Sequence, residues 1–99
     1  MDFCFEWDPR KAMANHRKHG VSFDQAATVF LDPQALSIYD DEHSGDEDRW
    51  ITMGISAAAG LLVVHHTHDD RPGSTVRIRI ISSRKATKRE ARQYAGQQP

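Results

Sequence analysis

The chain has 99 residues, of which 38% are hydrophobic, and its formal net charge is −1. This length suffices for two packed layers and little more, so we expect a single domain over residues 1–99. No apolar stretch is long enough to span a membrane, and the first residues, MDFCFEWD, lack the basic start and apolar run of a secretory signal. The single cysteine, Cys4, excludes an intramolecular disulfide and agrees with a cytoplasmic location.

The first third of the chain predicts one strand and two helices. Residues 3–7, FCFEW, alternate aromatic with smaller or polar side chains, as in a short strand. Asp8 and Pro9 then have the character of a helix start, and Gly20 that of a helix stop. A second helix begins after Ser22, whose spacing to a glutamine three residues later is that of a capping box.

The rest of the chain predicts four strands and a short helix. The strands are expected at residues 35–39, 49–56, 61–68 and 74–81. A second capping box starts at Thr87, so the last helix is placed near 88–95. The resulting order, β-α-α-β-β-β-β-α, implies an α+β fold in which an antiparallel β-sheet is packed with helices on one face.

Positive charge is concentrated near the end of the chain. Residues 77–94 contain seven Arg or Lys and one acidic residue. Arg77 and Arg79 point to one face of their strand and form a potential phosphate clamp. The expected corner after this strand adds two hydroxyls and two cations, namely Ser82, Ser83, Arg84 and Lys85. Because a helix start offers free backbone N–H groups, this pattern predicts an anion site there.

The acidic segment 32–48, with seven acidic residues and no Lys or Arg, leaves an alternative open. Its carboxylates and the cations near the end of the chain can also pair with one another within the fold. Within this segment His43, Glu47 and the adjacent Arg49 form either an acid–base set or a salt-bridged strand entry.

Three histidines lie in VVHHTHDD. His65 and His66 point to opposite faces of a strand, and His68 shares the face of His66. The spacing matches no recognised metal motif, so we expect no metal and interpret the imidazoles as proton-transfer groups. The P-loop, the dinucleotide fingerprint and the common hydrolase motifs are absent, and no cofactor is expected.

Taken together, these segments resemble the BrnT toxins, the toxin half of a bacterial type II toxin–antitoxin pair. The resemblance covers nearly the whole chain. It is carried, in order, by FEWDPRKAMANHRKHGVSFDQAATVFLDP, DDEHSGDEDRWITMGIS, LLVVHHTH and RIISSRKATKREARQY.

The resemblance implies a RelE-like fold and a metal-independent endoribonuclease that arrests growth by cutting RNA. It also implies neutralisation by a BrnA-like antitoxin with a ribbon-helix-helix DNA-binding domain, in a complex with two copies of each chain. DNA would then be contacted only through the antitoxin.

The matches to single residues give a candidate site. The expected catalytic residues are Glu47, Arg49, His66 and Arg79, and the expected RNA-binding residues are His43, Arg77, Ser82, Arg84 and Lys85. His68 departs from the family pattern.

Two other functions are compatible with the residues alone. A non-catalytic interaction module would use the basic segment to bind an acidic protein partner. A histidine-dependent metalloenzyme would lose its activity in the presence of a chelator.

Overall fold

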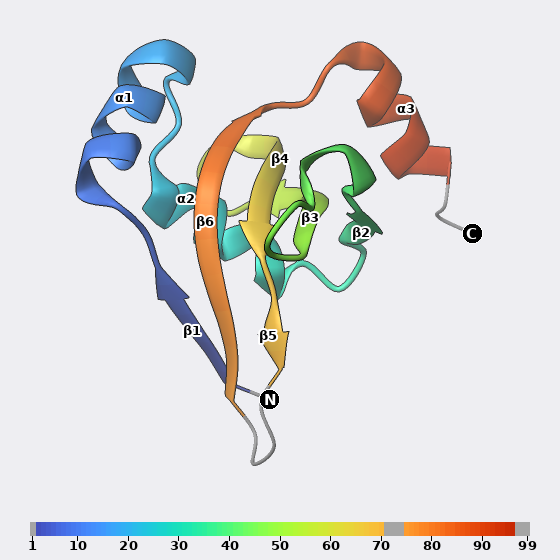
Figure 1. Ribbon diagram of the computed structural model, residues 1–99. Coiled ribbons are helices and arrows are strands. Elements are labelled where there is room, and N and C mark those ends of the chain that lie inside the picture. Colours follow the sequence, from blue (N-terminus) through green and yellow to red (C-terminus); the bar gives the residue numbers. More distant parts are fainter. Residues whose placement is uncertain (1, 71–74, 97–99) are drawn as a thin grey trace.

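A mixed β-sheet with helices packed on it forms the framework of the computed structural model, which describes residues 2–70 and 75–96 (Figure 1). The strands are β1 (Asp2–Glu6), β2 (Leu36–Tyr39), β3 (Arg49–Ser56), β4 (Gly60–Thr67), β5 (Asp69–Asp70) and β6 (Thr75–Lys85). The helices are α1 (Pro9–His19), α2 (Phe23–Thr28) and α3 (Lys88–Gly96), with 3₁₀ turns η1 (Val29–Leu31) and η2 (Asp41–His43). None of the helices in these two ranges is long and apolar enough to cross a membrane.

The strand order in the sheet is β1-β6-β4-β3-β2, and the short β5 also pairs with β6. All of these pairs are antiparallel except β1 with β6, which run parallel. The prediction of an antiparallel sheet is therefore wrong for this pair. The reason is that α1 and α2 carry the chain from one edge of the sheet to the other, so that β1 pairs with the last long strand.

The ends of the first two helices lie where the sequence predicts them. Asp8 accepts a hydrogen bond from the backbone N–H of Arg10 at 2.8 Å, and Gly20 ends α1 with a φ of 71°. Ser22 and Gln25 form both hydrogen bonds of a capping box at the start of α2. These local hydrogen bonds satisfy helix-end groups that the helix itself leaves unpaired.

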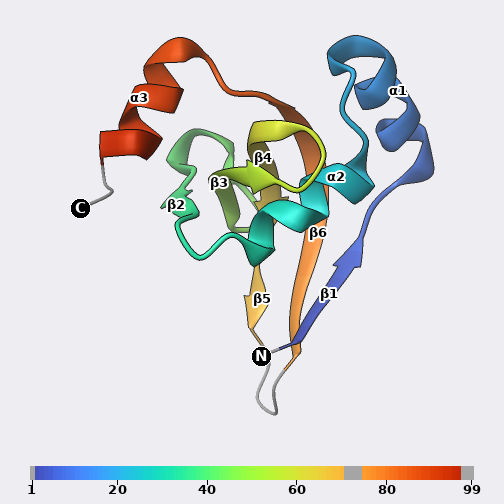
Figure 2. The same ribbon diagram turned by 180° about the vertical axis from the view of Figure 1, so that it is seen from behind.

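The helices α1 and α2 pack on one face of the sheet, which we call the inner face (Figure 2). Its core is made of fully buried apolar side chains from both layers: Val21, Phe23, Ala26, Val29, Leu62, Val64, Val76, Ile78 and Ile80. The buried Asn15 of α1 binds both backbone groups of Ser83, donating to the oxygen at 2.9 Å and accepting from the nitrogen at 3.0 Å. This pair of hydrogen bonds fixes α1 against β6.

The strand β6 continues to Lys85, through residues 82–85, which were predicted to form a corner. A bulge shifts its register with β4, so that His66 is opposite Ile80 whereas His65 is opposite Ser82. The helix α3 follows directly, and Thr87 and Glu90 form its predicted capping box. The prediction of a corner was wrong, because the bulge allows β6 to continue pairing with β4 as far as Lys85. The alternation of residues in the sequence does not show this bulge.

Candidate functional site

The face of the sheet opposite α1 and α2, which we call the outer face, is divided into two halves. Toward β2 it carries apolar side chains, which α3 partly overhangs: Leu36, Ile38, Ile51, Met53 and Val63. Toward β6 and the start of β3 lies what we call the charged half: Asp40, His43, Glu47, Arg49, His65, Arg79 and Ser82. Four of these residues come from three neighbouring strands, and the other three come from residues 40–47 between β2 and β3.

At the centre of the charged half, Asp40 faces two histidines. Its side chain is only 8% exposed, and its Oδ2 lies 2.9 Å from Nδ1 of His43 and 3.9 Å from Nδ1 of His65. Burial and the neighbouring Arg84 lower the pKa of His65, although Asp40 opposes this shift. The neutral imidazole of His65 on β4 and the imidazole of His43 on the loop therefore both lie beside the carboxylate of Asp40.

Two arginines complete this half. The carboxylate of Glu47 contacts Nη2 of Arg79 directly and lies 3.6 Å from Nη2 of Arg49. Within residues 2–70 and 75–96, the buried Nε of Arg49 has no acceptor. Glu47 thus holds two guanidinium groups near each other, and both keep N–H donors for an anion.

The loop between β2 and β3 is fixed over the sheet by its own hydrogen bonds. Asp40 donates its backbone N–H to the carbonyl of Arg49 at 2.8 Å. The Ser44 hydroxyl accepts from the backbone N–H of Arg49 at 2.9 Å and donates to the carbonyl of Asp40 at 2.6 Å. Beneath the loop is a hollow of about 270 Å³, which is lined by Asp40, His43, Arg49, His65, Ile81 and Ser82.

At the start of α3, Glu90 occupies part of the predicted anion site. Glu90 binds Arg84 through both carboxylate oxygens, at 2.7 and 2.9 Å, and also accepts from the backbone N–H of Thr87. The hydrogen bonds from Arg84 lower the pKa of Glu90 to about 2. One acidic side chain therefore occupies both the cation and the helix start that were expected to receive an external anion.

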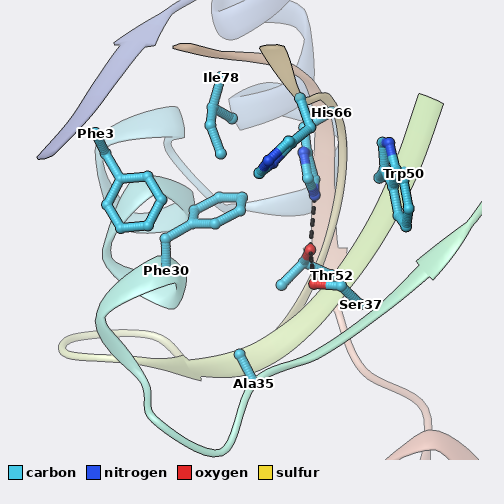
Figure 3. Close-up of a pocket in the computed structure, with 9 residues that line it drawn as sticks. Phe3, Phe30, Ala35, Ser37, Trp50, Thr52, His66 and Ile78 are labelled. Carbon is cyan, nitrogen blue, oxygen red and sulfur yellow. Dashed lines mark hydrogen bonds between the residues drawn. The ribbon is translucent and has the colours of Figure 1, made fainter. Parts of the chain in front are cut away.

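His66 lies on the inner face, where its side chain is 2% exposed and packs edge-on against Phe30. Its Nε2 is 2.6 Å from the Thr52 hydroxyl (Figure 3), and its Nδ1 is 2.8 Å from the carbonyl of Thr67. Burial lowers its pKa to about 4. The sheet thus separates His66 from the two arginines with which it was expected to act.

Most of the other predicted residues lie in or beside the charged half. The structure brings together His43, Glu47, Arg49, Arg79 and Ser82. Arg77 is beside them, in a second hollow of about 330 Å³ that Arg79 and Glu47 also line. Lys85 pairs with Leu62, a core residue of the inner face, and so lies on the other side of the strand from Arg84. The alternative of internal ion pairs holds in part, since Glu47 pairs with both Arg49 and Arg79.

Two residues of the charged half were missed, Asp40 and His65. The sequence showed that His65 and His66 face opposite ways, but the apolar run before them gave no indication of which face is covered by helices. Asp40 was one of seven acidic residues in its segment. Its position directly after a strand, three residues before His43, was the available indication.

The arrangement supplies two groups that can exchange protons and two cations beside them, which is the set needed for acid–base chemistry at a phosphate. Among the residues that the structure describes, no group of three or more His, Cys, Asp or Glu side chains is placed to hold a metal ion.

Comparisons with known proteins identify a matching family and a similar solved structure. The model of a family described as the ribonuclease toxin BrnT of type II toxin–antitoxin systems matches residues 7–90. The fold is similar to the crystal structure of the Brucella abortus ribonuclease toxin BrnT, with a TM-score of 0.59 and 20% sequence identity over 89% of this chain and 100% of that chain. At this identity the structural match concerns the fold alone. A comparison with proteins of curated function gives no match.

Proposed function

Because the chain belongs to the BrnT family of ribonuclease toxins of type II toxin–antitoxin systems, we propose that it cleaves RNA in the charged half of its outer face. The observation that carries this proposal is the shared carboxylate of Asp40, which faces two imidazoles beside a pair of arginines. The proposed reaction is attack of a ribose 2′-OH on the adjacent phosphorus, with departure of the 5′-oxygen of the next nucleotide. It requires a base, an acid and cations, and it uses no metal.

His65 is the proposed general base. The burial that lowers its pKa leaves the imidazole neutral at pH 7, and a neutral imidazole can take the proton of the 2′-OH. It replaces His66 in this role, because His66 is buried on the inner face and both of its ring nitrogens are hydrogen-bonded within the protein.

His43 is the proposed general acid. Asp40 engages its Nδ1, so that in the imidazolium form the proton on Nε2 is available for the leaving 5′-oxygen. Asp40 touches neither RNA nor the reacting atoms and is therefore a positioning residue, which orients one imidazole directly and lies within 3.9 Å of the other.

Arg49 and Arg79 are proposed to bind the scissile phosphate and to stabilise the charge that develops on its oxygens. Glu47 holds the two guanidinium groups near each other before RNA binds. The Ser82 hydroxyl lines the hollow beneath the loop, and Arg77 contacts a neighbouring phosphate.

The test is cleavage of an RNA oligonucleotide by purified protein in a buffer with EDTA. His65→Gln is expected to cut about 100-fold more slowly or worse, the usual loss for a general base, and Arg49→Ala is expected to lose about as much through the phosphate. The matched control is His16→Gln, a change on the exposed side of α1 that should cut at the wild-type rate.

Equal rates for wild type and His65→Gln would show that the base lies elsewhere. Loss of wild-type activity in EDTA would favour a metal-dependent enzyme. Binding of RNA or protein without any cleavage would favour the non-catalytic module.

The biological setting is also a proposal. The supporting observations are the family membership and the resemblance in sequence, which imply a RelE-like ribonuclease fold and action in the cytoplasm. The partner would be a BrnA-like ribbon-helix-helix antitoxin, in a complex with two copies of each chain that contacts DNA through the antitoxin. Induced expression of the chain should arrest growth, and coexpression of the neighbouring reading frame should relieve the arrest.

A further inference from the structure

The strand β2 lies at an edge of the sheet and is unusually apolar for that position. Its sequence is Leu-Ser-Ile-Tyr, with Ile38 61% exposed and Tyr39 41% exposed. Proteins usually protect an edge strand with charged side chains, proline or a bulge, because its unpaired backbone groups can bind another strand. Within Leu36–Tyr39 none of these three features is present.

On its inner side, β2 borders an open pocket of about 290 Å³ (Figure 3). Phe3, Phe30 and Trp50 form its walls, and Ser37, Thr52 and His66 lie at its base. These three polar groups satisfy one another. Because a carbonyl only accepts, Nδ1 of His66 carries the proton that binds Thr67, so Nε2 accepts from Thr52, whose oxygen in turn accepts from Ser37. Apart from His68, which also lines the pocket, the lining therefore suits an apolar side chain that makes no hydrogen bonds.

On its outer side, β2 borders a hollow of about 130 Å³ between the sheet and α3. On the sheet its lining is apolar, with Leu36 and Ile38 from β2 and Ile51, Met53 and Val63 from the neighbouring strands. Glu90 and Gln93 of α3 close one side. Successive side chains of a strand point to opposite faces of a sheet. A strand added beside β2 would therefore direct alternate side chains into the two hollows.

We propose that β2 binds an extended apolar segment of the antitoxin, which joins the sheet as an additional strand and fills both hollows with alternate side chains. The proposal rests on the proposed function in so far as the antitoxin is the partner. Backbone pairing would supply the binding energy, and the two hollows would select the register and the size of the apolar side chains.

The charges of α3, which borders the outer hollow, favour an acidic partner over a second copy of this chain, whereas β2 itself lies within the acidic segment 32–48. The exposed cations of α3 are Lys88, Arg89 and Arg92, whereas its one acidic residue, Glu90, is bound by Arg84. Antiparallel pairing of two identical edge strands has a two-fold axis perpendicular to the sheet. That axis would place two such basic helices on the same face of the joined sheet, where they repel. A segment with acidic residues on the side of α3 avoids this repulsion.

The experiment measures by calorimetry the affinity of purified chain for the protein of the neighbouring reading frame. Ile38→Asp changes the outer side of β2 and Ser37→Asp the inner side, and each is expected to weaken binding at least tenfold. Met13→Asp on α1 is the matched control, because Met13 is 63% exposed and Ile38 61%; it should bind as the wild type does. All three free variants should cleave RNA at the wild-type rate, because none alters the charged half.

Hydrogen exchange supplies a second measurement. Backbone amides of Leu36–Tyr39 should become protected when the antitoxin binds, in the wild type and in Met13→Asp. Wild-type affinity in Ile38→Asp, or unchanged exchange in β2, would overturn the proposal. If only one of the two aspartate variants binds the antitoxin more weakly, the antitoxin covers one face of the sheet and does not add a strand to it.

Two further outcomes would show that something other than the antitoxin binds β2, and either would overturn the proposal. If the chain alone forms a dimer that Ile38→Asp dissociates, the occupant is a second copy. If Ile38→Asp lowers the affinity for RNA, the occupant is the substrate. An inactive chain that still binds the antitoxin through β2 would contradict the proposed ribonuclease site and leave this inference intact.

Discussion

At the scale of single residues, His65 and His66 show how one step along a strand decides chemical role. His65 shares the outer face with Arg49 and Arg79, is 30% exposed and lies 3.9 Å from Asp40. His66 is enclosed by Phe30, Thr52 and the core. The neighbours in sequence are almost the same for both, so the difference arises from which face α1 and α2 cover.

The burial of His66 predicts that stability depends on pH. Its pKa is about 4 in the folded chain, against 6.5 for an exposed histidine. As pH falls below 6.5 the unfolded chain binds a proton that the folded chain does not, so stability decreases down to about pH 4 and then levels off for this group. The decrease amounts to up to about 3 kcal/mol.

His66→Gln tests this dependence. The variant should be less stable than the wild type at pH 7.5, because the Thr67 carbonyl loses the donor that Nδ1 of His66 supplies, and the difference in stability should narrow between pH 6.5 and 4.5. Urea unfolding at several pH values measures both effects. Parallel stability curves for the two proteins would contradict the assignment of this histidine as the buried, neutral one.

At the scale of elements, Gly54 permits the contact between β3 and the turn η1. A Cβ at this position would lie 2.8 Å from Cγ1 of Val29 and 3.2 Å from Cβ of Ala35. These neighbours belong to the core and to the chain leading into β2. Any side chain at this position therefore separates the inner layer from the sheet.

Gly54→Ala is accordingly expected to destabilise the fold by about 1–3 kcal/mol, the usual cost of overpacking a core. Gly45→Ala is the matched control, since a Cβ there would meet nothing within 4 Å, and it should unfold as the wild type does. Thermal or urea unfolding of the three proteins makes the comparison. A stable Gly54→Ala would mean that η1 can move away from β3 at little cost.

The elements also show what could be predicted from the sequence. The starts of α1, α2 and α3 were predictable, because each depends on a cap formed by residues within three positions of each other. The parallel pairing of β1 and the continuation of β6 to Lys85 were not, because they depend on strands far apart in the chain. The candidate site followed the same division: the short spacing of His43, Glu47 and Arg49 predicted that they lie close together, whereas the position of His65 beside them depends on which face the helices cover.

At the scale of the whole molecule, the acidic segment and the basic end of the chain offset each other in net charge. Glu47 pairs with Arg49 and Arg79, and Glu90 pairs with Arg84. The formal net charge of −1 is the sum of these opposing sets. Long-range attraction of RNA is consequently weak, and binding depends on the few cations that face the charged half.

This compensation predicts a shallow dependence of RNA binding on salt. If Arg49, Arg77 and Arg79 are the three cations that displace counterions from RNA, the slope of log K against log salt should be about −2.1, and it should become about −1.4 in Arg79→Ala. Arg17→Ala on α1, which packs on the inner face, should keep the wild-type slope. Fluorescence anisotropy with an oligonucleotide that carries deoxyribose at the cleavage position measures binding without turnover. A slope of about −3 or steeper would place further cations on the RNA, and those of α3 would be the first to examine, because α3 borders the outer face. In that case α3 would serve RNA and not the antitoxin, and the division of the outer face into a catalytic half and a protein-binding half would be wrong.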